Sequence, residues 1–236
     1  MSPPDESRRR RLVIAIDGPA ASGKSSTAQW VARQLGCRHV DSGSLYRAAT
    51  AAALRAGGSP DRWTAEDVLR AAAIVTLEPR ETSFVPVLGG ADAAAEIRTP
   101  PVTAAVSRVA RMSPVRLWVN RQVVEIARAY DVVVDGRDIG TAVLPDAPLK
   151  IWLVADPWER ARRRLIQRLS RYPADDEVAE ETDRLVRRDA LDATQSVPAG
   201  DAVLIDTTYL TQEEQVERIV ALARAVTQRE SETSAG

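Results

Sequence analysis

The residues of this sequence with the clearest chemistry form a glycine-rich loop that ends in a lysine and a serine. The loop matches the pattern G-x-x-x-x-G-K-[ST] and reads Gly18-Pro19-Ala20-Ala21-Ser22-Gly23-Lys24-Ser25, followed by Ser26. An apolar stretch of strand length, 12–16, precedes the loop, and a helix-forming stretch, 24–35, follows it. A strand that leads through such a loop into a helix directs main-chain N–H groups and the positive end of the helix dipole to one place. We therefore predict that residues 18–26 bind the phosphates of a nucleoside triphosphate.

Two side chains of this loop have specific expected roles. The ammonium of Lys24 would neutralise the β- and γ-phosphates, and the hydroxyl of Ser25 would bind Mg²⁺. The chain has 32 lysines and arginines, of which only Lys24 and Lys150 are lysines. A glycine-rich turn that merely caps a helix would not explain a lysine here, where a compact ammonium is preferred over a guanidinium.

Polar residues also follow the other predicted strands, and in an open α/β sheet ligands bind beyond the carboxyl ends of the strands. Asp135, which ends an apolar strand, is placed to hold Mg²⁺ through a water molecule, while Arg137 and Asp138 follow it. Asp41 or Ser42 could instead cap the next helix. Thr207 and Thr208 after the last strand are interpreted as turn and cap residues.

An arginine-rich stretch opens at 157 with an aspartate cap and a proline. Helical periodicity places one set of arginines on a shared face: Arg160, Arg164, Arg168 and Arg171. Two interpretations remain open. The face is either solvated, with arginines extended over the surface, or belongs to a lid whose guanidiniums close over a transferring phosphate.

The order of the remaining segments predicts the fold class. Strands are expected at 12–16, 38–40, 131–135, 149–154 and 202–205, with helices between them. This order predicts an α/β fold with a doubly wound, five-stranded parallel sheet, a small inserted subdomain at about 60–100 and a helical lid at 157–192. Within the insert, Pro86 suggests that the strand 83–88 lies at an edge.

Composition and length exclude several classes of protein. The chain has 236 residues, 44% of them hydrophobic, and we expect one domain over 12–228 with disordered tails at 1–11 and 229–236. A net charge of −1 argues against a nucleic-acid polymer as a partner. With one cysteine and one histidine, no zinc or iron site is expected, and Cys37 and His39 are interpreted as incidental residues of a short strand. No stretch reaches the roughly 20 apolar residues of a membrane span. We expect a cytoplasmic monomer.

Several blocks of sequence, taken in order, resemble those of the bacterial cytidylate (CMP) kinase family of P-loop nucleoside monophosphate kinases. They are Ile16-Asp17-Gly18-Pro19 with Gly23-Lys24-Ser25-Ser26, Asp41-Ser42-Gly43 with Tyr46-Arg47, Glu96-Ile97-Arg98-Thr99, Ser107 with Val115-Arg116, Asp135-Gly136-Arg137-Asp138-Ile139-Gly140-Thr141, Leu144-Pro145-Asp146-Ala147, and Arg188-Asp189 with Asp192. The resemblance covers about residues 12–228. The blocks at 41–47 and 135–141 are far more specific than the phosphate-binding loop, which many nucleotide-binding proteins share.

This resemblance implies a reaction and a set of roles. ATP and CMP or dCMP would give ADP and CDP or dCDP, with Mg²⁺ held by Ser25 and, through water, by Asp135. Residues 18–26 would cradle the ATP phosphates, and Lys24, Arg137 and Arg163 would be catalytic. The residues implied to bind CMP are Ser42, Tyr46, Arg47, Arg98, Ser107, Arg116, Arg137, Asp138, Arg188 and Asp192. Among these, Ser107, Arg116 and Asp138 would contact the cytosine edge.

The chain departs from the family pattern at Gln195, where the family usually has an arginine that would contact the acceptor. Two alternatives to a CMP kinase stay open. One is a related kinase for another small acceptor, such as UMP or a non-nucleotide alcohol, and the other is a nucleotide-sensing protein without catalysis. A GTPase is excluded, because Lys150 follows Leu149 and the Asn/Thr-Lys-x-Asp motif for guanine is absent.

Overall fold

A five-stranded parallel sheet forms the centre of the computed structural model, which describes residues 11–193 and 196–234. Its strands lie in the order β2-β6-β1-β7-β8. Their bounds are β2 Arg38–Asp41, β6 Val132–Asp135, β1 Val13–Asp17, β7 Leu149–Val154 and β8 Val203–Asp206. All four pairings are parallel, which confirms the predicted sheet. Strands such as β6 are buried along their whole length, as expected where helices cover both faces.

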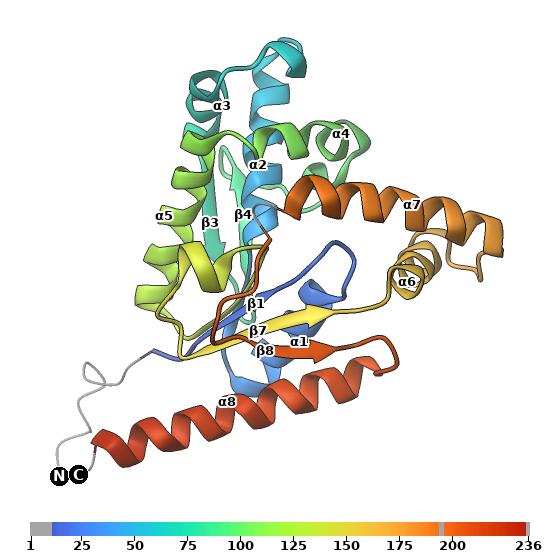
Figure 1. Cartoon of the computed structure of the whole chain (residues 1–236). Helices are drawn as coiled ribbons and strands as arrows, with labels where there is room; N and C mark the ends of the chain where they lie inside the picture. The colour runs from blue at the N-terminus through green and yellow to red at the C-terminus, as the bar shows by residue number, and fades with distance from the viewer. Residues whose placement is uncertain (1–10, 194–195, 235–236) are drawn as a thin grey trace.

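Two groups of helices cover the two faces of this sheet (Figure 1). Ile14 and Ile16 of β1 pack with α1 (Lys24–Leu35) and α8 (Gln212–Ser234). Ala15 between them points to the other face, which packs with α2 (Ser42–Ala56), α4 (Pro100–Val109) and α5 (Ser113–Ala129). The sheet is therefore doubly wound. The helix α8 continues to Ser234, so 229–234 are helical rather than disordered, and 1–10 and 235–236 lie outside the described residues.

A second, antiparallel sheet lies inside the predicted insert. It contains β3 (Val75–Pro79), β4 (Phe84–Leu88) and β5 (Ala91–Asp92), preceded by α3 (Ala65–Ala71). The predicted edge position of Pro86 was wrong, because β4 is the middle strand. The Pro86 carbonyl accepts a hydrogen bond from the Ala93 N–H, but the proline has no N–H to donate in return. The pairing ends there, and β5 has only two residues.

Two helices extend from the sheet at the predicted lid position (Figure 1). They are α6 (Pro157–Leu169) and α7 (Asp175–Asp192). Asp156 caps α6 by accepting hydrogen bonds from the N–H groups of Trp158 and Glu159. Their buried apolar residues, which include Leu165 and Leu185, form one cluster with Ala20 of the phosphate-binding loop. These two helices, called the lid helices below after their predicted role, therefore rest directly on the loop that the sequence assigns to a nucleotide.

Candidate active site

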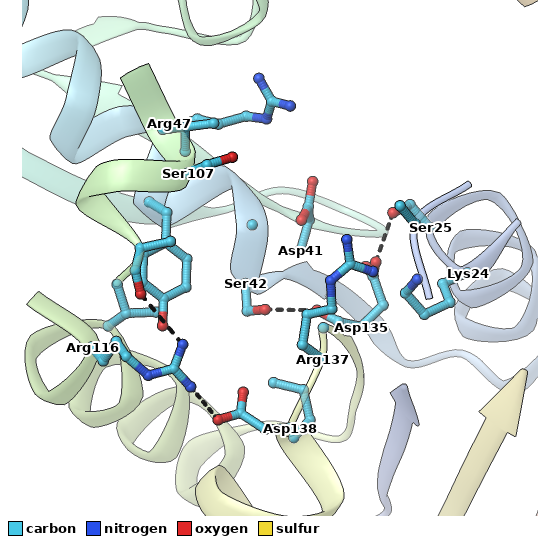
Figure 2. A pocket seen from close by; sticks show the side chains of 18 of the residues that line it. Lys24, Ser25, Asp41, Ser42, Arg47, Ser107, Arg116, Asp135, Arg137 and Asp138 are labelled. Atoms are coloured by element: carbon cyan, nitrogen blue, oxygen red, sulfur yellow. Dashed lines mark hydrogen bonds and ion pairs between the residues drawn. The ribbon is translucent and has the colours of Figure 1, made fainter. Parts of the chain in front are cut away.

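One cavity of about 310 Å³ lies beyond the carboxyl ends of β2, β1 and β6. It gathers most of the residues that the sequence predicted to act together. Those that line it are Lys24, Ser25, Ser42, Tyr46, Arg47, Arg98, Ser107, Arg116, Asp135, Arg137, Asp138 and Arg188. Figure 2 shows Lys24 and Ser25 on one side of this cavity and Arg116 and Asp138 on another. Asp192 ends α7, but its side chain and all of Gln195 lie outside the described residues.

The phosphate-binding loop has the backbone geometry that its glycines allow. Gly18 has a φ of 148°, and an added Cβ would lie 2.1 Å from the Leu153 carbonyl oxygen. Gly23, with a φ of 88°, precedes the first turn of α1. The ammonium of Lys24 donates to the Pro19 carbonyl and to Ser22 Oγ. Burial, together with the charge of Arg137, lowers the pKa of Lys24 to about 7.

A second hollow lies along the same loop. It is lined by residues of the loop, the lid and the start of α8: Ala21, Ser22, Gly23, Lys24, Ser25, Ser26, Arg98, Arg163, Arg164, Gln167, Arg168, Leu210, Gln212 and Gln215. Among the described residues, five line both hollows: Ala21, Lys24, Ser25, Arg98 and Arg164. Two molecules bound in the two hollows would therefore meet at Lys24 and Ser25.

Ser25 and Asp135 form the pair that the sequence assigned to a metal ion. The Ser25 hydroxyl donates to Asp135 Oδ2 at 2.6 Å (Figure 2). Burial alone would raise the pKa of Asp135, but His39, Ser25 and Lys24 outweigh it and hold that pKa below its usual range. An ionised carboxylate beside a hydroxyl fits Mg²⁺, whose other ligands would come from phosphates and water. Within the described residues, no group of three or more His, Cys, Asp or Glu side chains could hold a metal alone.

The loop after β6 is tied to the end of β1 and to Gly18 behind it by three hydrogen bonds. Arg137 Nη1 donates to the Gly18 carbonyl at 2.9 Å. The Asp17 carboxylate accepts the N–H groups of Ile139 at 2.9 Å and Gly140 at 2.7 Å. Burial raises the pKa of Asp17 to about 6, although these two N–H groups oppose the shift. The contacts hold Arg137 and Asp138 in place beside the phosphate-binding loop.

The far end of the cavity combines an ion pair with apolar walls. The guanidinium of Arg116 on α5 donates to the Asp138 carboxylate. Burial raises the pKa of Asp138, and Arg116 limits that rise. Burial also raises the pKa of Tyr46 to about 12, so its phenol stays protonated at neutral pH. Ser107 and the apolar residues Val119, Val123 and Ile139 complete this end. A flat ring with donors and acceptors on one edge fits such a surface.

Positive charge concentrates between the two ends of the cavity. Burial lowers the pKa of Arg47, and the nearby charges of Arg188, Arg98 and Arg164 lower it further. Arg47 Nη1 also donates to Thr103 Oγ1 at 3.1 Å, which fixes the guanidinium against α4. Of the described residues in the 60–100 segment, Arg98 alone lines the cavity. Converging guanidiniums of this kind bind phosphate groups.

The arginines between positions 160 and 171 do not share one environment. Arg160 is 4% exposed, and its guanidinium donates to the Ala20 carbonyl and to Asp189. The shared solvated face was therefore wrong for Arg160, because its partners come from distant segments. Arg163 donates to the carbonyls of Thr207 and Thr208, and Arg171 pairs with Glu177. The catalytic role of Arg163 stays a prediction.

Some residues of the site were not singled out from the sequence. Arg111 and Asn120 line the cavity, and Asp41, which was considered only as a cap, does so while it caps α2. His39, which was interpreted as incidental rather than as part of a catalytic pair, contacts Asp135. The sequence could have indicated Asn120, because it lies four residues after Arg116 and residues four apart share a helix face. The contact of His39 depends on strand register, which the sequence alone does not show.

Comparison with known proteins gives one consistent family. The sequence profile of cytidylate kinase matches residues 14–225. A cytidylate kinase of Mycobacterium leprae is 42% identical over 226 residues, which cover 90% of this chain and 96% of the relative. A cytidylate kinase of Thermus thermophilus is also 42% identical, over 91% of this chain and 99% of the relative.

A solved structure, described as an uncharacterized protein from Eubacterium ventriosum, matches with a TM-score of 0.50 at 10% identity. The match covers 91% of this chain and 99% of that one, and it supports the fold alone. The sequence profile and the curated relatives, by contrast, each span most of the chain at substantial similarity. From these two findings, the chain belongs to the cytidylate kinase family.

Proposed function

We propose that this protein transfers the γ-phosphoryl group of ATP to CMP or dCMP, and so forms ADP and CDP or dCDP. The observation that carries the proposal is the cavity that joins the Arg116–Asp138 pair to Lys24 and Ser25. A nucleoside monophosphate fits this cavity with its base at one end and its phosphate at the other. The names of the curated relatives support the same reaction.

The base end suits cytosine by its pattern of donors and acceptors. The 4-amino group of cytosine donates hydrogen bonds, and Asp138 can accept them. The ring N3 and O2 of cytosine accept hydrogen bonds, and Arg116 and Ser107 can donate them. Uracil has an oxygen at position 4 and an N–H at position 3, so its pattern opposes that of Asp138 and Arg116. This difference favours CMP over UMP.

The phosphate end suits phosphoryl transfer, which depends mainly on position and charge. The transferred group spreads negative charge over its oxygens, and fixed cations lower the energy of that state. Lys24 faces both hollows, Arg137 is held against Gly18, and Arg163 and Arg164 extend from the lid. Mg²⁺, held by Ser25 and through water by Asp135, would neutralise the β- and γ-phosphates when bound. The lid helices would exclude water, which protects ATP from hydrolysis.

A direct test is the release of ADP from ATP with a series of acceptors. We expect turnover with CMP and dCMP, far slower turnover with UMP and AMP, and none with shikimate, a non-nucleotide alcohol. Equal use of CMP and UMP would contradict the acceptor assignment. Nucleotide binding without turnover of any acceptor would support a sensor instead.

A further inference from the structure

Asp135 is held at both carboxylate oxygens, and one partner is a histidine that the proposed chemistry does not use. Oδ2 accepts from Ser25, whereas Oδ1 lies 2.6 Å from Nε2 of His39. His39 is 8% exposed and Asp135 is 3% exposed, so water has little access to the contact. A short contact between two buried polar groups restricts both of them strongly.

The charge state of Asp135 fixes the direction of this hydrogen bond. An aspartate side chain, with an ordinary pKa of about 3.9, is ionised at neutral pH, and Oδ2 of Asp135 already accepts from Ser25. An ionised carboxylate can only accept hydrogen bonds, so Nε2 of His39 must carry the hydrogen. The histidine therefore donates to Oδ1 whether or not the ring is charged.

Strand register explains why these residues meet. His39 on β2 pairs with Val133 on β6, and Asp41 pairs with Asp135. Because side chains alternate along a strand, His39 and Asp135 point to the same face of the sheet. Val133 packs on this face with residues of α1, the helix that carries Ser25 near its start. The fold thus places His39 and Ser25 where each can hold one oxygen of Asp135.

A second carboxylate lies next to this contact. Burial and the negative charge of Asp135 raise the pKa of Asp41 to about 6, and the charge of His39 opposes that rise. Without His39, Asp135 would keep one fixed oxygen and would be repelled by Asp41. Its carboxylate could then rotate away from Ser25.

We propose that His39 is a positioning residue, whose Nε2–H fixes Oδ1 of Asp135 so that Oδ2 stays directed at Ser25 and the Mg²⁺ position. This inference rests on the proposed function, since it concerns the metal side of the nucleotide site. His39 would touch neither substrate. Its removal should therefore change the dependence on Mg²⁺ and leave CMP binding unchanged.

The first test compares His39→Leu, which has no donor, with His39→Gln, whose side-chain N–H has a similar reach. Calorimetry would measure the binding of a non-hydrolysable ATP analogue with Mg²⁺ and with EDTA. We expect His39→Leu to weaken binding with Mg²⁺ by roughly 10- to 100-fold, the usual effect of removing a partner of a metal ligand, and to leave binding in EDTA unchanged. His39→Gln should restore most of the affinity.

Val40→Ala is the matched control, because Val40 lies next to His39 on β2 and is buried in the core on the other face. This variant should lower the melting temperature and leave the Mg²⁺ dependence unchanged. The inference would be overturned if the Mg²⁺ dependence of His39→Leu were unchanged. It would also be overturned if His39→Gln bound the analogue with Mg²⁺ as weakly as His39→Leu does.

A second measurement needs no variant. The chain has a single histidine, so an untagged sample with ¹⁵N-labelled histidine gives one imidazole spin system. We expect a hydrogen on Nε2 in the free protein and a shift of that signal when Mg²⁺ joins the bound analogue. An unprotonated Nε2 would overturn the inference even if His39→Leu fails to fold. If the parent protein phosphorylates CMP but His39→Leu binds the analogue with Mg²⁺ as tightly as the parent does, the inference alone fails. If the effect is present without CMP turnover, the proposed function alone fails.

Discussion

The carboxylate of Asp189 in lid helix α7 accepts a hydrogen bond from the main-chain N–H of Ala20 in the phosphate-binding loop, at 3.1 Å. The same carboxylate accepts from Arg160 Nη1 at 2.6 Å, and Arg160 also donates to the Ala20 carbonyl. Both main-chain groups of Ala20 are thus bound by the lid. The base of the lid and the loop therefore form one connected unit.

This unit predicts that Asp189→Ala destabilises the fold strongly. The change leaves the guanidinium of Arg160, whose side chain is 5% exposed, buried without its anion. Loss of one partner of a buried ion pair usually costs about 3–5 kcal/mol of unfolding free energy. Because Asp189 is itself partly exposed, we expect the lower end of that range, measured by urea denaturation.

Two comparisons test the reason for that loss. Glu180→Ala breaks the exposed pair with Arg184 on the same helix, and should cost less than about 1 kcal/mol. The double variant Arg160→Met with Asp189→Ala should recover part of the stability, because it removes the buried charge. If the double variant is no more stable than Asp189→Ala, the unpaired charge is not the cause.

The lowered pKa of Lys24 predicts that the protein takes up a proton when ATP binds. Its pKa of about 7 in the free protein means that most molecules carry a neutral amine at pH 8. The phosphates of ATP favour the ammonium, so binding should take up close to one proton at pH 8 and very little at pH 6. Above pH 7 the affinity should fall by up to about tenfold per pH unit.

Calorimetry in two buffers with different ionisation enthalpies measures this uptake. ATP itself is fully deprotonated at pH 8, since the last phosphate pKa is about 6. Lys24→Ala is the control, and it should show no uptake and a turnover lower by roughly 10²-fold. An uptake that persists in Lys24→Ala would assign the proton to another group.

The sequence predicted those parts of the molecule that depend on neighbours along the chain. The glycine loop and the buried strands carry their own local signals, and parallel strands must bring their carboxyl ends together. That rule was sufficient to predict a common cavity for Ser42 and Asp138, which come from separate segments, whereas Arg116 on α5 was named only from the family resemblance.

The parts that the sequence missed depend on contacts between distant segments. Periodicity placed Arg160 on one face with Arg164, Arg168 and Arg171, either solvated or part of a lid, but the partners of Arg160 are Asp189 and the Ala20 carbonyl. His39 had no apparent partner until strand register placed it beside Asp135. Pro86 had the local signal of an edge strand, but its strand β4 lies between β3 and the two-residue strand β5. Contacts of this kind are set by packing, which local patterns do not encode.

The two neighbouring lid arginines should have different kinetic effects. Arg163 donates to the carbonyls of Thr207 and Thr208. Of the two hollows, it lines only the second one, which the phosphate-binding loop and the start of α8 also line. Arg164 lines both hollows, and Glu181 holds its Nε at 3.0 Å. Arg164→Ala should lower kcat by roughly 10²-fold, the usual effect of losing one preorganised donor of charge.

Arg163→Ala should instead raise the KM for ATP, because it releases the segment before α8 that lines the second hollow, where ATP is expected to bind. Steady-state kinetics with varied ATP and CMP separates the two effects. Gln167→Ala on the same helix is a control for the loss of a hollow-lining side chain without charge. A larger loss of kcat in Arg163→Ala than in Arg164→Ala would support the assignment made from the sequence.

Asp138→Asn should narrow the preference for CMP over UMP. The amide can donate to the oxygen at position 4 of uracil, whereas the carboxylate can only accept from the amino group of cytosine. A hydrogen bond to a charged group contributes about 1.5–3 kcal/mol, so kcat/KM for CMP should fall by roughly 10- to 100-fold. The kcat/KM for UMP should fall by a smaller factor or rise.

Ser107→Ala removes one donor at the same end of the cavity without changing the charge, and serves as the control. It should lower kcat/KM for CMP and UMP by similar factors, because both bases have an oxygen at position 2. Asp138 also holds Arg116, so a purely structural role must be distinguished from base recognition. Equal losses for CMP and UMP in Asp138→Asn would indicate that Asp138 only orients Arg116, since the loss of a direct contact to the amino group must affect cytosine more than uracil.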